Sequence, residues 1–112
     1  MSNTVIDAET VRERGDELYV LDIRPTYSYE EAHIPGSHSL PVYDQLKGEN
    51  FIGLEVSAAE LPDDREIAVV CFSGSTAAVA AERLRELGFD AKAMRGGINN
   101  WDASTTGTAA TA

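Results

Sequence analysis

The clearest sign of the fold is the segment VVCFSGSTAAVAAERLRELGF, residues 69–89. Apolar residues lead into Cys71, the only cysteine of the chain, and a short run of mostly small residues follows. From Ser75 to Leu87, alanines and leucines recur on one face at helical spacing, and most charged residues fall on the other. Gly88 then supplies a residue suited to end a helix. The segment is therefore predicted to form a buried strand, a tight loop and an amphipathic helix.

Further strands are indicated by apolar runs elsewhere in the chain. Residues 17–23 and 66–72 are near-continuous apolar runs, which is typical of buried strands. Shorter candidates span residues 38–42 and 90–94, and Val5 lies in a candidate edge strand. Strands that alternate with helices predict a parallel α/β sheet with right-handed crossovers.

Helices are predicted between these strands. Asp7 is a suitable N-cap and Gly15 a suitable stop for a first helix. The capping-box pattern of Ser57 and Glu60 predicts a short helix that starts at Ser57. Residues 44–56 have weak periodicity and are interpreted as a loop or a short helix.

The size and composition of the chain narrow its class. A length of 112 residues, 43% of them hydrophobic, predicts a single globular domain. The apolar runs are shorter than the roughly 18 residues that suggest a membrane-spanning helix. Residues 1–15 lack the apolar region of a secretory signal. One cysteine excludes an internal disulfide, so a cytoplasmic location is expected.

The charge of the chain is strongly negative. There are 19 acidic residues against 9 Lys and Arg, a formal net charge of −10. Such a charge argues against nucleic acid or an anionic membrane as a partner, because both would repel the protein. Lysine occurs only at Lys47 and Lys92. This composition fits both an ordinary acidic protein and one from a salt-adapted, halophilic proteome.

Cys71 has two interpretations. A free cysteine is most often a small buried hydrophobe of the core. Here, however, it stands at the carboxyl end of a predicted central strand, where open α/β sheets bind ligands. It also precedes a helix N-terminus, whose unpaired N–H groups and positive dipole favour a thiolate and form a cradle for anions. This context predicts a nucleophilic reaction centre.

Three segments, in this order, resemble the rhodanese-like sulfurtransferases. They are VLDIRPTYSYEEAHIPGSHSLP at residues 20–41, the segment at 69–89, and MRGGINNW at residues 94–101. The resemblance implies a three-layer α/β fold with a central, mostly parallel, five-stranded sheet. It also implies a domain over residues 1–104, and residues 105–112 are then expected to be a flexible tail.

The resemblance also implies a site. The family's catalytic cysteine corresponds to Cys71, and Asp22 and His33 correspond to supporting positions. The residues expected to bind substrate are Phe72, Ser73, Gly74, Ser75, Thr76 and Arg24. Simpler roles remain open for the supporting residues: Asp22 as a cap or a partner of Arg24, Arg24 as half of an ordinary ion pair, and His33 as part of a turn. Gly96 and Gly97 are expected to form a turn close to the active-site loop, and Trp101 to fill the core beside the last helix.

The loop departs from the family pattern in its charge. Many members have Arg then Ser where this chain has Thr76 and Ala77, and others have Lys or Arg where it has Phe72 and Ser73. Residues 71–82 therefore contain no cation. The departure concerns substrate choice and turnover rather than the fold.

The resemblance implies an enzyme that moves sulfane sulfur from thiosulfate or a similar donor to a thiol, cyanide or protein acceptor through a persulfide on Cys71. No metal or organic cofactor is expected; two histidines and one cysteine do not supply four zinc ligands without carboxylates. Two alternatives stay open. One is a non-catalytic interaction or regulatory module, and the other is a cysteine-dependent phosphatase or arsenate reductase.

Overall fold

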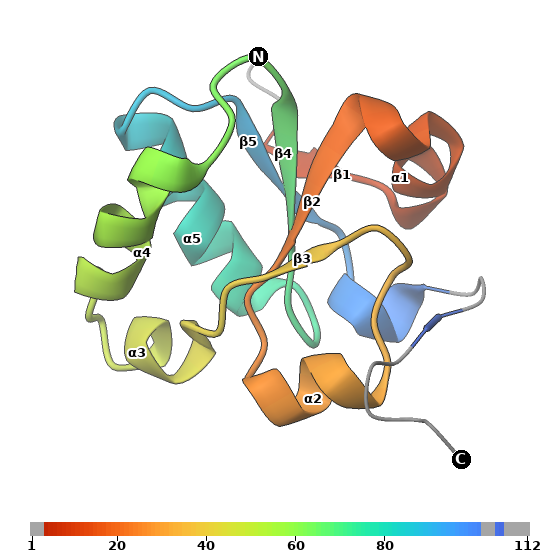
Figure 1. The fold of residues 1–112 in the computed structure, drawn as a ribbon, viewed down its shortest axis with the longest axis horizontal. Helices are drawn as coiled ribbons and strands as arrows, with labels where there is room; N and C mark the ends of the chain where they lie inside the picture. The colour runs from red at the N-terminus through yellow and green to blue at the C-terminus, as the bar shows by residue number, and fades with distance from the viewer. Residues whose placement is uncertain (1–3, 102–104, 107–112) are drawn as a thin grey trace.

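The computed structural model describes residues 4–101 and 105–106. Its centre is a sheet of five strands in the order β1-β5-β4-β2-β3, and every pairing is parallel (Figure 1). The strands are β1 (Val5–Ile6), β2 (Leu18–Asp22), β3 (His38–Ser39), β4 (Glu66–Val70) and β5 (Ala91–Met94). The predicted sheet is confirmed, with β4 at its centre.

Within the described residues, five α-helices and three 3-10 turns surround the sheet. They are α1 (Ala8–Arg14), α2 (Thr26–Glu31), α3 (Tyr43–Lys47), α4 (Ile52–Ser57), α5 (Ser75–Glu86), η1 (Gly15–Glu17), η2 (Ala58–Glu60) and η3 (Gly97–Asn100). None of the helices within the described residues is long and apolar enough to cross a membrane.

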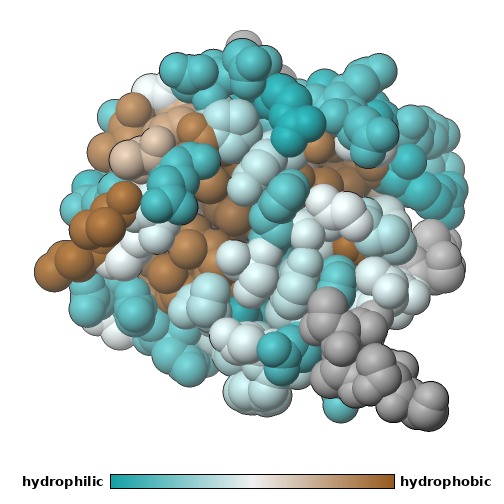
Figure 2. All heavy atoms as spheres, in the orientation of Figure 1, coloured by the Kyte–Doolittle hydropathy of each residue, from teal (hydrophilic) through white to brown (hydrophobic). Residues whose placement is uncertain are grey.

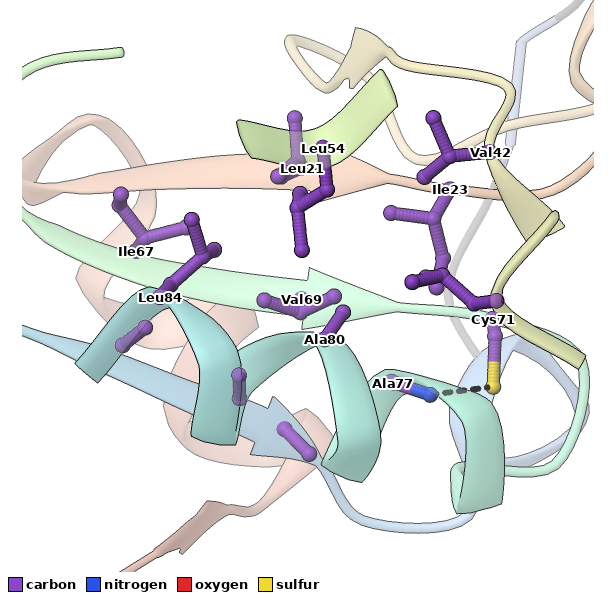
Figure 3. Close-up of a cluster of buried hydrophobic side chains, with 14 of the residues drawn as sticks. Leu21, Ile23, Val42, Leu54, Ile67, Val69, Cys71, Ala77, Ala80 and Leu84 are labelled. Atoms are coloured by element: carbon purple, nitrogen blue, oxygen red, sulfur yellow. Dashed lines mark hydrogen bonds between the residues drawn. The ribbon is translucent and has the colours of Figure 1, made fainter. Parts of the chain in front are cut away.

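Successive side chains of β4 point to opposite faces of the sheet, and this divides the core into two layers. Ile67 and Val69 face a cluster formed with α3, α4 and α5, whereas Ala68 and Val70 face a cluster formed with α1 and η3. Both clusters are tightly buried, since these four strand residues are 0% exposed. Figure 3 shows the first cluster, in which α5 lies along β4. The three-layer α/β architecture is therefore confirmed.

Alanines let α5 approach the sheet closely. Ala77, Ala80 and Ala81 are completely buried on its inner face, with Leu84 at the same level of burial. The helix ends at Glu86, and the glycine predicted to follow it adopts a left-handed φ of 100°. Short side chains on this face place the helix backbone, including its first turn, near the end of β4.

The short helix predicted to start at Ser57 is present as the 3-10 turn η2, which has Ser57 as its N-cap but lacks the side-chain capping hydrogen bond. Ser57 is also the last residue of α4, a helix that the capping pattern did not indicate. Leu54 is 0% exposed and anchors α4 one turn earlier than the capping pattern suggested. Residues 44–56, interpreted as a loop or short helix, contain most of α3 and nearly all of α4.

Two smaller details concern the helix ends. Asp7 does precede α1, but its carboxylate accepts a hydrogen bond from Arg95 Nε at 3.0 Å. Gly15 follows the last residue of α1 with a φ of 51°, as a helix stop requires. α2 was not predicted, and it buries none of its residues, so no apolar stripe marks it in the sequence.

The molecular surface is uneven in character. Figure 2 shows hydrophilic residues over α1 and much of the same face, whereas hydrophobic residues gather over and beside α4. Ile52 and Val56, one turn apart on α4, are 67% and 71% exposed. The rest of the surface on this face is largely polar, as the composition suggests.

Candidate active site

The candidate site begins where β4 ends. Cys71 follows Val70, the last residue of β4, and three residues separate it from Ser75, the first residue of α5. The cysteine is 1% exposed. Its side chain belongs to the same cluster as Ile67 and Val69, on the face of the sheet that α5 covers. The sequence prediction of a thiol at the carboxyl end of the central strand is confirmed.

Backbone donors meet the sulfur from two positions. Gly74 N–H donates to Cys71 Sγ at 3.1 Å, and Ala77 N–H donates to it at 3.3 Å. Figure 3 shows the second bond, with the sulfur against the first turn of α5. Hydrogen bonds of this kind favour a negatively charged sulfur over a neutral one, because the donors and the helix dipole both present positive charge.

Ala77 is a contact of Cys71 that the sequence analysis missed. The prediction named the loop residues 72–76, but the second donor lies one residue further along. A signal was available, since the first four N–H groups of a helix lack intrahelical partners. With Ser75 as the first helical residue, Ala77 occupies the third of these positions.

Glycines allow the loop to pack against its neighbour. Gly74 has a φ of 106°, and a Cβ there would lie 3.2 Å from the backbone nitrogen of Gly96. A Cβ on Gly97 would lie 2.6 Å from the carbonyl oxygens of Cys71 and Phe72. The predicted close approach of Gly96 and Gly97 to the active-site loop is therefore confirmed.

The turn η3 holds the loop by backbone hydrogen bonds. Ile98 N–H donates to the carbonyl oxygen of Cys71 at 2.8 Å, and Asn99 N–H donates to that of Phe72 at 3.1 Å. Trp101, partly buried, packs against the α1-side cluster just beyond η3. These bonds hold the backbone of Cys71 and Phe72 against η3.

Asp22 and Arg24 reach the same edge of the sheet from β2. The Arg24 side chain donates from Nε to Asp22 Oδ1 at 3.0 Å and from Nη2 to Asp22 Oδ2 at 2.8 Å. Nη2 also donates to the carbonyl oxygen of Ala32 at 2.7 Å. Both charged side chains are buried, at 1% for Asp22 and 6% for Arg24. The pair is thus a buried, bidentate ion pair.

Phe72 connects this ion pair to the loop. The guanidinium carbon of Arg24 lies 5.7 Å from the centroid of the Phe72 ring. Tyr43 meets the same ring edge-on, with centroids 5.0 Å apart. Of the other loop residues, Ser73 and Ser75 are exposed and Thr76 is 8% exposed. The expected substrate-binding residues therefore run from the loop at Phe72 into the first turn of α5 at Thr76, and Arg24 lies over the Phe72 ring.

His33 lies in a separate turn. Its Nδ1 is 2.6 Å from the carbonyl oxygen of Tyr29, so this nitrogen carries a proton, and its ring stacks on that of Tyr29 at 3.8 Å. Its backbone also forms an antiparallel bridge with Thr106. The flexible tail predicted for residues 105–112 lies mostly outside the described residues, and within them Thr106 is held by this bridge.

This geometry defines a class of protein: a parallel α/β domain with a buried thiol that accepts hydrogen bonds from backbone donors at the end of its central strand. The family model of the rhodanese-like domain matches residues 6–104. The chain therefore belongs to the rhodanese-like domain family.

Relatives with established names support the assignment. The thiosulfate sulfurtransferase GlpE of Pseudoalteromonas translucida is 32% identical over 90 residues, which cover 80% of this chain and 77% of that protein. The adenylyltransferase and sulfurtransferase MOCS3-2 of Zea mays is 33% identical over 88 residues, 78% of this chain. The chain spans only 18% of the length of that maize protein.

Solved structures share the fold. A rhodanese-related protein from Thermoplasma volcanium has a TM-score of 0.75 and 25% identity, covering 93% of this chain and 98% of its own. The rhodanese-like domain of Alr3790 from Anabaena has a TM-score of 0.77 at 22% identity, and the match covers 99% of this chain and 85% of the Anabaena chain. The second likeness concerns the fold alone.

Proposed function

We propose that this protein is a sulfurtransferase that carries a sulfane sulfur as a persulfide on Cys71. The observation that carries the proposal is the pair of N–H groups, from Gly74 and Ala77, directed at Sγ. A core cysteine needs no such donors, whereas a thiolate nucleophile does. The name of the relative GlpE, a thiosulfate sulfurtransferase, points to the same chemistry.

The reaction has two halves. The Cys71 thiolate attacks the outer sulfur of thiosulfate or a similar donor; a new S–S bond forms, the donor's S–S bond breaks, and sulfite leaves with the bonding electrons. The thiolate of a small molecule or protein acceptor, or cyanide, then attacks the outer sulfur and regenerates the Cys71 thiolate. Gly74 and Ala77 donate to the sulfur that bears charge in both halves. These steps require a reduced thiol, as a cytoplasmic location would provide, and no metal or organic cofactor.

The remaining site residues act by positioning. Arg24 is bound to Asp22 and lies over the Phe72 ring, so we assign the pair to holding the loop at a fixed distance from β2. His33 orders the turn that includes Ala32, whose carbonyl oxygen accepts a hydrogen bond from Arg24. We expect these residues to affect the rate of sulfur transfer through the loop.

Mass spectrometry tests the proposal. After incubation with thiosulfate or a polysulfide, the intact protein should gain the mass of one sulfur atom, and a thiol should remove it. Cys71→Ala should abolish the gain, while the exposed-surface variant Val56→Ser should retain it. Absence of any adduct with several sulfane donors would contradict sulfur transfer and favour an interaction module.

The same preparation distinguishes phosphatase chemistry. Phosphoryl transfer from an aryl phosphate needs a guanidinium near the end of the loop to neutralise the equatorial oxygens. Ala77 occupies that place, and α5 already begins at Ser75. We expect the wild-type protein to form the persulfide without hydrolysing p-nitrophenyl phosphate. Hydrolysis that disappears in Cys71→Ser would instead identify a phosphatase.

A further inference from the structure

We propose that the preferred donor of Cys71 carries an organic group and at most one negative charge, as an organic persulfide or a thiosulfonate does, and that the thiosulfate dianion is a poor donor. This inference rests on the proposed function and concerns the choice of substrate at the same site. It follows from the charges near the loop and from the aromatic side chains at it.

The loop offers a dianion little positive charge. Residues 71–82 contain no Lys, Arg or His. The Arg24 guanidinium lies over the Phe72 ring, and its Nε and Nη2 are engaged by the Asp22 carboxylate and a backbone carbonyl. Because the opposite charge of Asp22 is 2.8 Å away, the field of the guanidinium is largely cancelled at the loop.

Lys47 is the cation on the other side of the aromatic pair. Its ammonium group lies 5.4 Å from the centroid of the Tyr43 ring, and that ring meets Phe72 edge-on. Lys47 is exposed, so water and salt screen its charge. The net charge of −10 adds a general repulsion that acts twice as strongly on a dianion as on a monoanion.

The aromatic side chains at the loop favour an organic group. Phe72 in the loop and Tyr43, which meets its ring edge-on, are both partly exposed. Ile23 and Val42, at 0% and 4% exposure, are buried in the same apolar cluster as Cys71, so the surroundings of the sulfur are apolar (Figure 3). Replacing one oxygen of thiosulfate with a phenyl ring removes one charge and adds apolar area that these aromatic residues can cover.

The chemistry balances without a further reactant. With a thiosulfonate, the Cys71 thiolate bonds to the outer sulfur, the donor's S–S bond breaks, and a sulfinate leaves with the electron pair. With an organic persulfide, the leaving group is a thiolate and the proton stays on the transferred sulfur. The site thereby reaches the same Cys71 persulfide from either donor.

Single-turnover loading of Cys71, followed by mass spectrometry, tests the inference. The loading rates with thiosulfate and with benzenethiosulfonate are compared after each is normalised to the rate at which the same donor reacts with free cysteine. We expect the normalised rate to be about tenfold higher for benzenethiosulfonate. Added KCl should raise the rate with thiosulfate more than the rate with benzenethiosulfonate. Equal or faster loading by thiosulfate would overturn the inference and leave sulfur transfer intact. Loading by neither donor would contradict the proposed function itself.

Added cations provide a matched pair of variants. Ser73→Arg places a guanidinium in the loop, and Val56→Arg makes the same change of net charge on the exposed face of α4. Ser73→Arg should raise the thiosulfate rate about fivefold and the benzenethiosulfonate rate about twofold. Val56→Arg should change neither rate by more than about twofold.

If Ser73→Arg loses the native circular dichroism spectrum, Ser75→Arg, also at an exposed position, replaces it. A thiosulfate rate unchanged by a folded loop variant would contradict the inference.

Discussion

At the scale of single residues, the site depends on places where a side chain is missing. Gly97 lies directly against the backbone of Cys71 and Phe72, and its φ of 61° is one that L residues rarely adopt. The loop therefore has its shape partly because a glycine from a distant part of the chain leaves room for it. Gly15 has a similar φ of 51° but open space around it.

This pair of glycines gives a controlled prediction. Gly97→Ala should lower the free energy of unfolding by about 3 kcal/mol. The left-handed backbone of an alanine costs about 1 kcal/mol, and displacing the loop to make room for its Cβ accounts for the rest. Gly15→Ala should lose only about 1 kcal/mol. Urea denaturation of both variants measures the difference, and loading of Cys71 with sulfur should be slowed in Gly97→Ala alone. Equal destabilisation of the two variants would show that the close approach of Gly97 is not limiting.

At the scale of elements, a charged cluster joins the amino ends of the central strands to α1. Glu66, at the start of β4, accepts hydrogen bonds from Arg14 at 2.7 Å and from Lys92 of β5 at 2.5 Å. Burial alone would raise the pKa of Glu66, but the hydrogen bonds from Lys92 and Arg14 outweigh burial and lower it below its ordinary value of 4.5. The cluster therefore stabilises the fold while Glu66 is ionised.

The pKa of Glu66 predicts a pH dependence. Because it is lower in the folded state, the stabilisation is complete above about pH 5 and is lost as the pH falls through the folded-state value. At pH 7, Glu66→Gln should unfold with a free energy about 1 kcal/mol lower than the wild type. The difference should shrink below pH 4.5, the ordinary value. Urea denaturation across this range measures it, with Glu9→Gln on the exposed face of α1 as the control. A difference independent of pH would contradict the assignment.

At the scale of the whole molecule, the surplus of acidic residues sets the response to salt. With a net charge of −10, carboxylates across the surface repel one another at low ionic strength. Added salt screens this repulsion, since the Debye length falls to about 3 Å at 1 M. The folded state, being compact, gains more from screening than the unfolded chain does.

We therefore expect the melting temperature to rise in 1 M KCl relative to dilute buffer, by about 4 °C or more if screening contributes about 1 kcal/mol. Calorimetry or circular dichroism measures this shift. A variant with Glu60→Gln, Asp63→Asn and Asp64→Asn removes three of the 19 acidic residues at exposed positions and should show a smaller rise. A melting temperature that is unchanged or lower in KCl would exclude adaptation to salt and leave the fold unaffected.

The sequence by itself determined the elements whose signals are local. The apolar runs that became β2 and β4 and the periodic face of α5 could be predicted, because periods of two and 3.6 residues specify which side chains share a face. Family motifs placed Cys71 and the turn at Gly96 and Gly97.

Only the tertiary structure decided features that depend on distant contacts. The end of α4 at Ser57 follows from the burial of Leu54 in a core built by other segments. The buried pairing of Arg24 with Asp22 and Phe72, and hence the charge available to a substrate, depends on β2 and β4 ending at the same edge. The donor at Ala77 requires α5 to lie close to β4. Each is a contact between segments, and the energy of such a contact does not exist until the chain has folded.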